Sequence, residues 1–152
     1  MHIGMIGGIG PAATEFYYRG LVKAHTAANR RMDLTIVHAD TNEMVQNLED
    51  GAILKQAQIF SGFAKQLKAG GAEAVVITSM GGHFCVAEFE AISVLPVINA
   101  IPVLNAHFVK MGVKRVGLLG TKTVMQSQLY GGLSSVQVVA PPSHELDRVH
   151  QE

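Results

Sequence analysis

The stretch that decides the fold is residues 3–11, which read IGMIGGIGP. Its first four residues form a short apolar run, which predicts a buried strand that ends at Gly7-Gly8. Pro11 lies where a helix then begins, because its fixed φ suits the first helical turn. Apolar residues recur at helical spacing from there to about residue 28. The chain is therefore predicted to open with a strand, a glycine turn and a helix.

The alternation of strand and helix continues along the chain. Strands are predicted at residues 34–39, 74–77, 97–99, 115–119 and 136–139, and helices at residues 52–69, 83–91, 102–110, 121–133 and from 145 onward. Residues 40–42, Asp-Thr-Asn, are predicted as a polar loop. The run at residues 74–77 is apolar throughout, as expected of a strand covered on both faces. This order predicts an α/β fold with a doubly wound parallel sheet.

The composition excludes several classes of protein. The chain has 152 residues, 48% of them hydrophobic and 16% charged, which is typical of globular domains. Its 12 basic and 12 acidic residues are dispersed, so we expect no nucleic-acid partner. The single cysteine, Cys85, fits a reducing compartment. No signal peptide opens the chain and no apolar run nears the roughly 20 residues that span a bilayer, so we expect a cytoplasmic protein without membrane contact.

The carboxyl ends of the predicted strands mark the place for a ligand, because open α/β sheets bind ligands in the crevice outside those ends. These ends are residues 7–10, 40–42, 78–83, 99 and 120–123. The first contains Gly8-x-Gly10-x-x-Ala13, which fits a dinucleotide pattern with Asp40 as its acid, somewhat beyond the usual ~20 residues. Pro11 inside the pattern argues against a nucleotide. Tight-turn glycines are a second interpretation, and a small anion at the helix N-terminus is the one we favour.

Four short motifs fall in order over nearly the whole chain. They are residues 6–14 (IGGIGPAAT), 71–77 (GAEAVVI), 95–97 (LPV) and 116–121 (VGLLGT). Together they resemble the aspartate/glutamate racemase family. The resemblance implies two similar α/β domains with the active site between them, and a homodimer. In this chain it implies a racemase-like domain at residues 1–112 and the incomplete start of a second at residues 113–152.

The family resemblance also implies a chemistry: inversion at the Cα of a small acidic amino acid, with no pyridoxal phosphate, other cofactor or metal. Family members carry one cysteine in a Cys-Asn-Thr-x-His loop and another in a later Gly-Cys-Thr-Glu loop, one thiolate removing the α-proton and the opposite thiol returning one. Aligned on His83, this chain has Ser79 at the first cysteine and Met80-Gly81 in place of Asn-Thr. The second loop is not in this sequence.

The motifs and the strand ends together define the candidate residues. Ser79, assisted by His83, is the candidate proton-transfer group, because a serine hydroxyl needs activation by a neighbour. The candidate substrate-binding residues are Gly8, Gly10, Pro11, Thr41, Asn42, Met80, Gly81 and Thr121. Simpler interpretations stay open: Ser79, His83 and Thr121 as turn or capping residues, and Cys85 as a small buried hydrophobe in preference to a displaced nucleophile. The seven histidines show no metal-ligand spacing.

Three functions therefore remain in view. The first is an amino-acid racemase whose second thiol comes from residues outside this sequence. The second is a non-catalytic relative that binds a small carboxylate, and the third is a nucleotide-binding domain. We expect an incomplete form of a longer protein in preference to a genuine short product, because a second domain with so few strands would leave apolar faces open.

Overall fold

Two units make up the computed structural model, which describes residues 1–151: Met1–Ile98 and Asn99–Glu152. The division lies earlier than the boundary expected after residue 112, because helix α5 (Ala100–Met111) bonds within the second unit. The Asn105 side chain donates to Gly132 O at 2.8 Å and accepts from the Ser135 amide at 3.1 Å. The assignment of domains to residues 1–112 and 113–152 stays a prediction.

Four strands form the sheet of the first unit: β1 (His2–Gly7), β2 (Asp33–His38), β3 (Ala74–Ile77) and β4 (Val97–Ile98). They lie in the order β2-β1-β3-β4, and every pair of neighbours is parallel. All four residues of β3 are buried, as their continuous apolar character predicts. The predicted α/β fold with a parallel sheet is confirmed.

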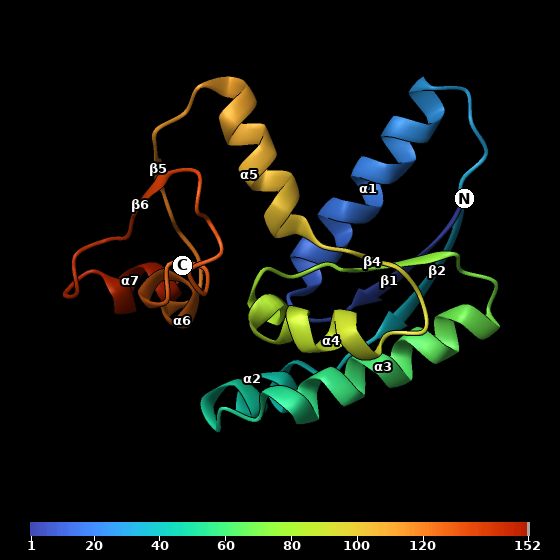
Figure 1. The fold of residues 1–152 in the computed structure, drawn as a ribbon, viewed down its shortest axis with the longest axis horizontal. Helices are drawn as coiled ribbons and strands as arrows, with labels where there is room; N and C mark the ends of the chain where they lie inside the picture. The colour runs from blue at the N-terminus through green and yellow to red at the C-terminus, as the bar shows by residue number, and fades with distance from the viewer. Residues whose placement is uncertain (152) are drawn as a thin grey trace. The chain divides into compact units, whose positions relative to one another are not determined.

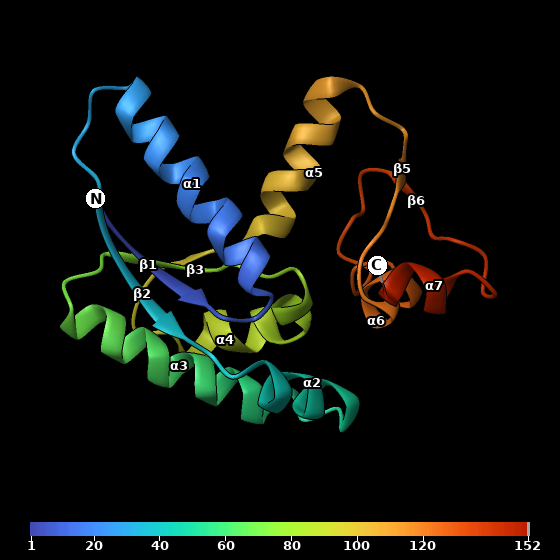
Figure 2. The ribbon, with the colours of Figure 1, turned by 180° about the vertical axis from the view of Figure 1, so that it is seen from behind.

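Helices cover both faces of this sheet. Helix α1 (Pro11–Ala27) lies over one face, and α2 (Thr41–Glu49), α3 (Ile53–Ala69) and α4 (Val86–Ile92) lie over the other (Figures 1 and 2). Side chains alternate between the faces along a strand. In β1, Met5 accordingly packs with Tyr17 of α1, whereas Ile6 joins the core that holds Phe60 of α3. The sheet is therefore doubly wound.

The turn after β1 requires glycine because neighbouring atoms leave no room for a Cβ. Gly8 has a φ of +91°, and a Cβ on it would stand 2.5 Å from Ala39 O. A Cβ on Gly7 would stand 2.7 Å from Thr14 Cγ2. Gly10, with a φ of 75°, caps the start of α1, and Pro11 follows as its first residue. Only glycine lets β1 turn this closely into α1.

The segment after β2 corrects the prediction of a polar loop at residues 40–42. Helix α2 begins at Thr41, and Asp40 is its N-cap, accepting from the Glu43 amide at 2.8 Å. An acidic cap followed three residues later by Glu43 is a helix-start signal that the loop prediction overlooked. The helix predicted at residues 83–91 also starts earlier, with a 3-10 turn η1 (Gly81–Cys85) before α4.

The second unit holds α5, the parallel strand pair β5 (Arg115–Gly117) and β6 (Gln137–Val139), and the short helices α6 (Lys122–Gln126) and α7 (Leu146–Gln151). Helix α6 is shorter than the predicted helix at residues 121–133. Gln128, Leu129, Tyr130 and Gly131 all take positive φ, which ends the right-handed helix. The side chains of Leu129, within this left-handed turn, and of Leu133, just after it, are buried.

Substitution of two glycines tests the constraint at Gly8. We expect Gly8→Ala to lower the free energy of unfolding by about 3 kcal/mol, because the new Cβ meets backbone and the φ is positive. Gly20→Ala is the matched control: nothing lies within 4 Å of its Cβ, and alanine stabilises a helix interior by about 1 kcal/mol. Urea unfolding followed by circular dichroism measures both, and equal shifts would contradict the constraint.

Candidate active site

The topological switch point of the sheet lies between β1 and β3. The chain leaves β1 for α1 on one face and leaves β3 for η1 and α4 on the other (Figure 1). Open parallel sheets bind ligands in the crevice outside the strands at such a point. The predicted glycine loop follows β1 and the predicted Ser79 loop follows β3, so the fold brings these two candidate segments to neighbouring strand ends.

Two threonine hydroxyls join the two loops. The Gly8 amide donates to Thr14 Oγ1 at 3.1 Å, Thr14 Oγ1 lies 3.0 Å from Thr78 Oγ1, and the Thr78 hydroxyl donates to Ile6 O at 3.0 Å. Neither threonine was among the residues that the sequence selected as candidates. The available signal was their position, with Thr14 in the first turn after Pro11 and Thr78 directly before Ser79.

Both polar backbone groups of Gly8 form hydrogen bonds within the protein. Its amide donates to Thr14, and its carbonyl accepts from the Thr41 hydroxyl at 2.8 Å. Thr41 therefore supports the glycine turn, and Gly8 offers no N–H to a ligand. In residues 1–151, the amides of Gly10 and Ala12 donate to no other protein group. The capacity to hold an anion lies with these amides at the N-terminus of α1.

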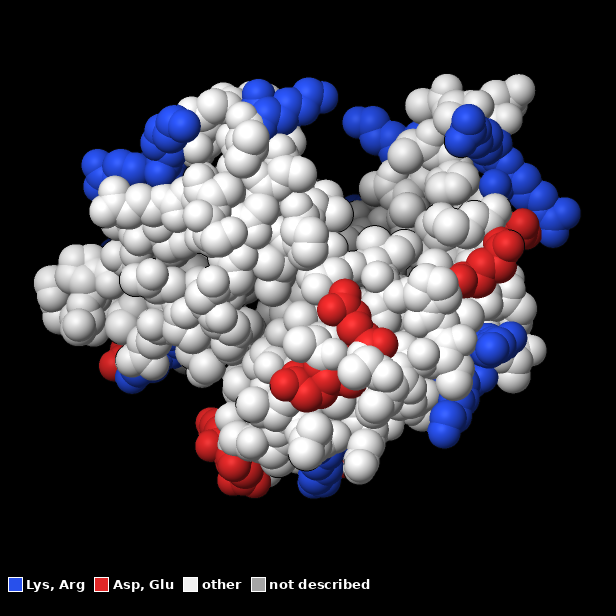
Figure 3. Space-filling model, in the orientation of Figure 1, with Lys and Arg blue, Asp and Glu red and all other residues white. Residues whose placement is uncertain are grey.

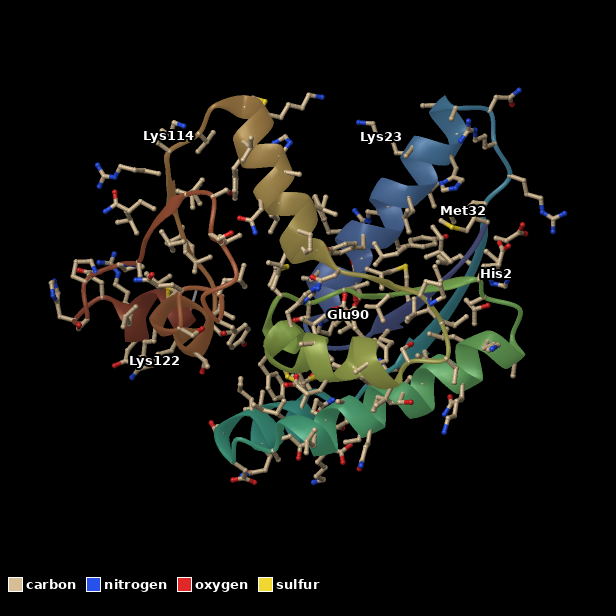
Figure 4. The ribbon with its side chains drawn as sticks, viewed as in Figure 1. His2, Lys23, Met32, Glu90, Lys114 and Lys122 are labelled. Carbon is tan, nitrogen blue, oxygen red and sulfur yellow. The ribbon has the colours of Figure 1, made fainter. Side chains whose placement is uncertain are left out.

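His83 is buried, with 3% of its surface exposed, and its Nδ1 lies 2.8 Å from Ser79 O. A carbonyl only accepts, so Nδ1 carries the proton and Nε2 is left as the acceptor. Burial lowers the pKa of His83, while the bond to the Ser79 carbonyl and the charge of Glu90 on α4 (Figure 4) act to raise it. The loop folds back as the sequence suggests, but the ring contacts the Ser79 carbonyl and not its hydroxyl.

The main chain of the Ser79 loop is held firmly. Ser79 O also accepts from the Gly82 amide at 3.2 Å, and Met80 O accepts from the His83 amide at 3.1 Å. Ser79, Met80 and Gly81 are all partly exposed, at the carboxyl end of β3. Three of the predicted site residues thus share one short turn whose backbone is fixed by hydrogen bonds.

Two further candidates lie at helix starts. Asn42 is exposed in the first turn of α2. Thr121 caps α6 in the second unit, accepting from the Val124 amide at 3.4 Å. Asp40, the acid of the dinucleotide interpretation, uses one carboxylate oxygen to cap α2. Capping therefore accounts for Asp40 without a nucleotide.

Comparison with known protein families identifies the family of this chain. The model of the Asp/Glu/Hydantoin racemase family matches residues 6–147. The chain belongs to this racemase family. The match spans the glycine loop, the Ser79 loop and most of the second unit, in agreement with the resemblance carried by the sequence motifs.

Solved structures of racemase-like proteins have the same fold. An aspartate racemase homologue from Pyrococcus horikoshii OT3 matches with a TM-score of 0.82 and 27% identity, covering 99% of this chain and 68% of that one. A candidate Asp/Glu racemase from Yersinia pestis matches with a TM-score of 0.81 and 28% identity, covering 99% and 69%. An aspartate racemase from Picrophilus torridus, at 22% identity and a TM-score of 0.72, covers 99% and 66% and supports the fold alone.

In this racemase-family chain, Cys85 is a core residue. Its side chain is fully buried, its Sγ lies 3.7 Å from Gly82 O, and burial raises the pKa of the thiol to about 12. The interpretation of Cys85 as a small buried hydrophobe is confirmed. Among the described residues, no three His, Cys, Asp or Glu side chains come together as metal ligands. None of the helices in that part of the chain has the length and apolar character needed to cross a membrane.

The buried imidazole of His83 predicts a pH dependence of stability. Below the ordinary histidine pKa of 6.5, the unfolded chain binds a proton that folded His83 resists, so the free energy of unfolding falls as the pH drops from 7 to 5. In His83→Asn this contribution disappears, while the amide can still donate to Ser79 O. Urea unfolding of both proteins across this range measures the difference, and identical pH profiles would contradict it.

The buried thiol predicts chemical inertness. In the native protein at pH 8, Cys85 is expected to react with iodoacetamide only as fast as the protein unfolds, because its thiolate is disfavoured and enclosed. In strong urea it is expected to react fully. Ser79→Cys is the matched control, since it places a thiol in a partly exposed turn. Rapid labelling of native wild-type protein, read by mass spectrometry, would restore Cys85 as a candidate nucleophile.

Proposed function

We propose that this protein is a cofactor-independent amino-acid racemase that acts at the Cα of a small acidic amino acid, aspartate or glutamate. The observation that carries the proposal is the meeting of the glycine loop and the Ser79 loop at the switch point of the sheet. Membership of the racemase family supports the reaction class. The solved structures described as racemases or racemase homologues support it further.

In this proposal the substrate carboxylate binds at the N-terminus of α1. The free amides of Gly10 and Ala12 supply donors there, next to Pro11, and the helix dipole favours a negative charge. Asn42, Met80 and Gly81 are proposed to contact the substrate from the neighbouring strand ends. Gly8 and Thr41 shape the turn. Thr121, the N-cap of α6, stays a proposed substrate-binding residue.

Ser79 is the proposed proton-transfer group. Its hydroxyl is a weak base and requires a neighbouring acceptor, for which the free Nε2 of neutral His83 is the candidate. The ring would have to reach this hydroxyl through the substrate, through a water molecule or by turning. Inversion also requires a group on the opposite face of the substrate, because a single base returns the proton to the face it came from. No residue of this chain is proposed as that second group.

A second function is favoured by one observation, the bond of His83 to the Ser79 carbonyl. With Nδ1 held there and a hydroxyl in place of the family's thiol, Ser79 lacks the direct partner that would activate it. The alternative is a non-catalytic relative that binds a small carboxylate at the same strand ends.

Oligomeric state, location and ligand class are also proposed. We propose a homodimer located in the cytoplasm, with small-molecule amino acids or carboxylates as ligands. Lys and Arg side chains lie in separate groups around the edge of the visible face and form no continuous basic surface there (Figure 3), which supports the expectation of no nucleic-acid partner.

Deuterium exchange tests the proposed reaction. The protein is incubated in D2O with L- and D-aspartate and glutamate, and the Cα proton is followed by NMR. We expect wild-type protein to exchange this proton and Ser79→Ala to lose the activity. Ser79→Cys is expected to exchange it at least tenfold faster, because a thiol with an ordinary pKa of about 8.5 is the better base near neutrality.

The outcomes separate the two functions. Exchange that survives in Ser79→Ala would exclude Ser79 as the proton-transfer group. Binding of aspartate or glutamate, seen by calorimetry, without exchange in the wild type would favour the non-catalytic relative. Optical rotation then distinguishes inversion from exchange on one face.

A further inference from the structure

We infer that Thr14 and Thr78 are positioning residues that lock the glycine loop to the Ser79 loop through one directed chain of hydrogen bonds. The chain, here called the threonine chain, consists of the Gly8 amide, the Thr14 hydroxyl, the Thr78 hydroxyl and the Ile6 carbonyl. Its existence is independent of the reaction, whereas its consequence for Ser79 rests on the proposed function.

The direction of the threonine chain follows from its two ends. An amide N–H can only donate and a carbonyl can only accept, and each hydroxyl has one hydrogen. The Thr78 hydroxyl donates its one hydrogen to Ile6 O. In the 3.0 Å contact between the two hydroxyl oxygens, Thr14 is therefore the donor and Thr78 the acceptor. Thr14 then accepts from the Gly8 amide. No other assignment of the hydrogens makes all three bonds.

The threonine chain ties helix α1, on one face of the sheet, to the end of strand β3 within the sheet. Thr14 comes from the first turn of α1, and Thr78 comes from the end of β3, 64 residues further along. Thr78 is completely buried, and its amide also donates to Ile6 O at 3.1 Å. The methyl group of Thr14 is packed so closely over Gly7 that a Cβ there would stand 2.7 Å away. Both hydroxyls are therefore held by packing as well as by hydrogen bonds.

This arrangement separates positioning from substrate contact. Both hydroxyl hydrogens are consumed within the threonine chain, so neither threonine has a hydrogen to donate to a substrate carboxylate. Ser79 follows Thr78 directly, and its main chain is fixed by the bonds to Gly82 and His83. The place of the Ser79 hydroxyl relative to the α1 N-terminus is thereby set by the threonine chain, as a proton-transfer group requires.

Two valine substitutions give an asymmetric test. Valine keeps the shape of threonine and removes the hydroxyl. Thr14→Val takes away the acceptor of the Gly8 amide, whereas Thr78→Val leaves that bond intact. We expect hydrogen exchange of the Gly8 amide, measured by 15N NMR, to be about tenfold faster in Thr14→Val and changed by less than about twofold in Thr78→Val.

Controls separate this local effect from general destabilisation. The Val75 amide, which donates to Pro96 O at 2.9 Å, is the internal reference, because global unfolding would accelerate both amides. Thr14→Ser keeps the hydroxyl and is expected to restore the wild-type rate at Gly8. Thr14→Ala provides the same test if valine prevents folding. An unchanged Gly8 amide in Thr14→Val, or an equal acceleration in Thr78→Val, would overturn the threonine chain.

The deuterium-exchange assay tests the consequence for Ser79. Both valine variants are expected to lower kcat for exchange at Cα by about tenfold or more with KM little changed, and the serine variants to restore it. A rise in KM alone would overturn the positioning role in favour of a substrate contact, and an unchanged kcat would overturn it outright. If wild-type protein shows no Ser79-dependent exchange, the proposed function fails, while the NMR measurement at Gly8 still decides the threonine chain.

Discussion

The absence of room for a side chain at Gly8 is the constraint on which the arrangement of the strand ends depends. With a φ of +91° and Ala39 O beside its Cα, the backbone turns sharply enough for α1 to start directly over the sheet. The same turn presents its amide to Thr14 and its carbonyl to Thr41. Helices α1 and α2, on opposite faces of the sheet, are thereby fastened to a single residue at the end of β1.

Most of the first unit could be predicted from the sequence because its local signals agree with one another. The apolar runs of β1 and β3, the proline at the start of α1 and the apolar stripe of α3 each indicate the element that forms. The three polar residues 40–42 alone predict a loop, whereas Asp40 and Glu43 together mark the start of helix α2. The early end of α6 could not be predicted, since left-handed backbone at Gln128 and Leu129 has no signature in composition.

Only part of the candidate site could be predicted from the sequence. The sequence separates Ser79 and His83 by four residues, which is enough to predict that the turn brings them together. Whether the ring bonds to the hydroxyl or to the carbonyl depends on burial and on the 3-10 turn, which are properties of the folded chain. The pairing of Thr14 with Thr78 crosses 64 residues and has no local pattern, so it becomes visible only once β1 and β3 lie side by side. Gly8 is a predicted substrate-binding residue, but in the folded chain its amide and its carbonyl are both hydrogen-bonded within the protein.

The burial of Cys85 also bears on how the protein would meet an oxidising environment. Sulfenic acids and mixed disulfides form from accessible thiolates, and this thiol is enclosed, with a pKa raised to about 12. Ser79, which the resemblance aligns with a family cysteine, carries an oxygen that has no comparable oxidation ladder. Peroxide that would inactivate a thiol-dependent relative therefore has no accessible cysteine thiol to oxidise in this chain. A serine at residue 79 is therefore not open to the thiol oxidation that would inactivate a cysteine there.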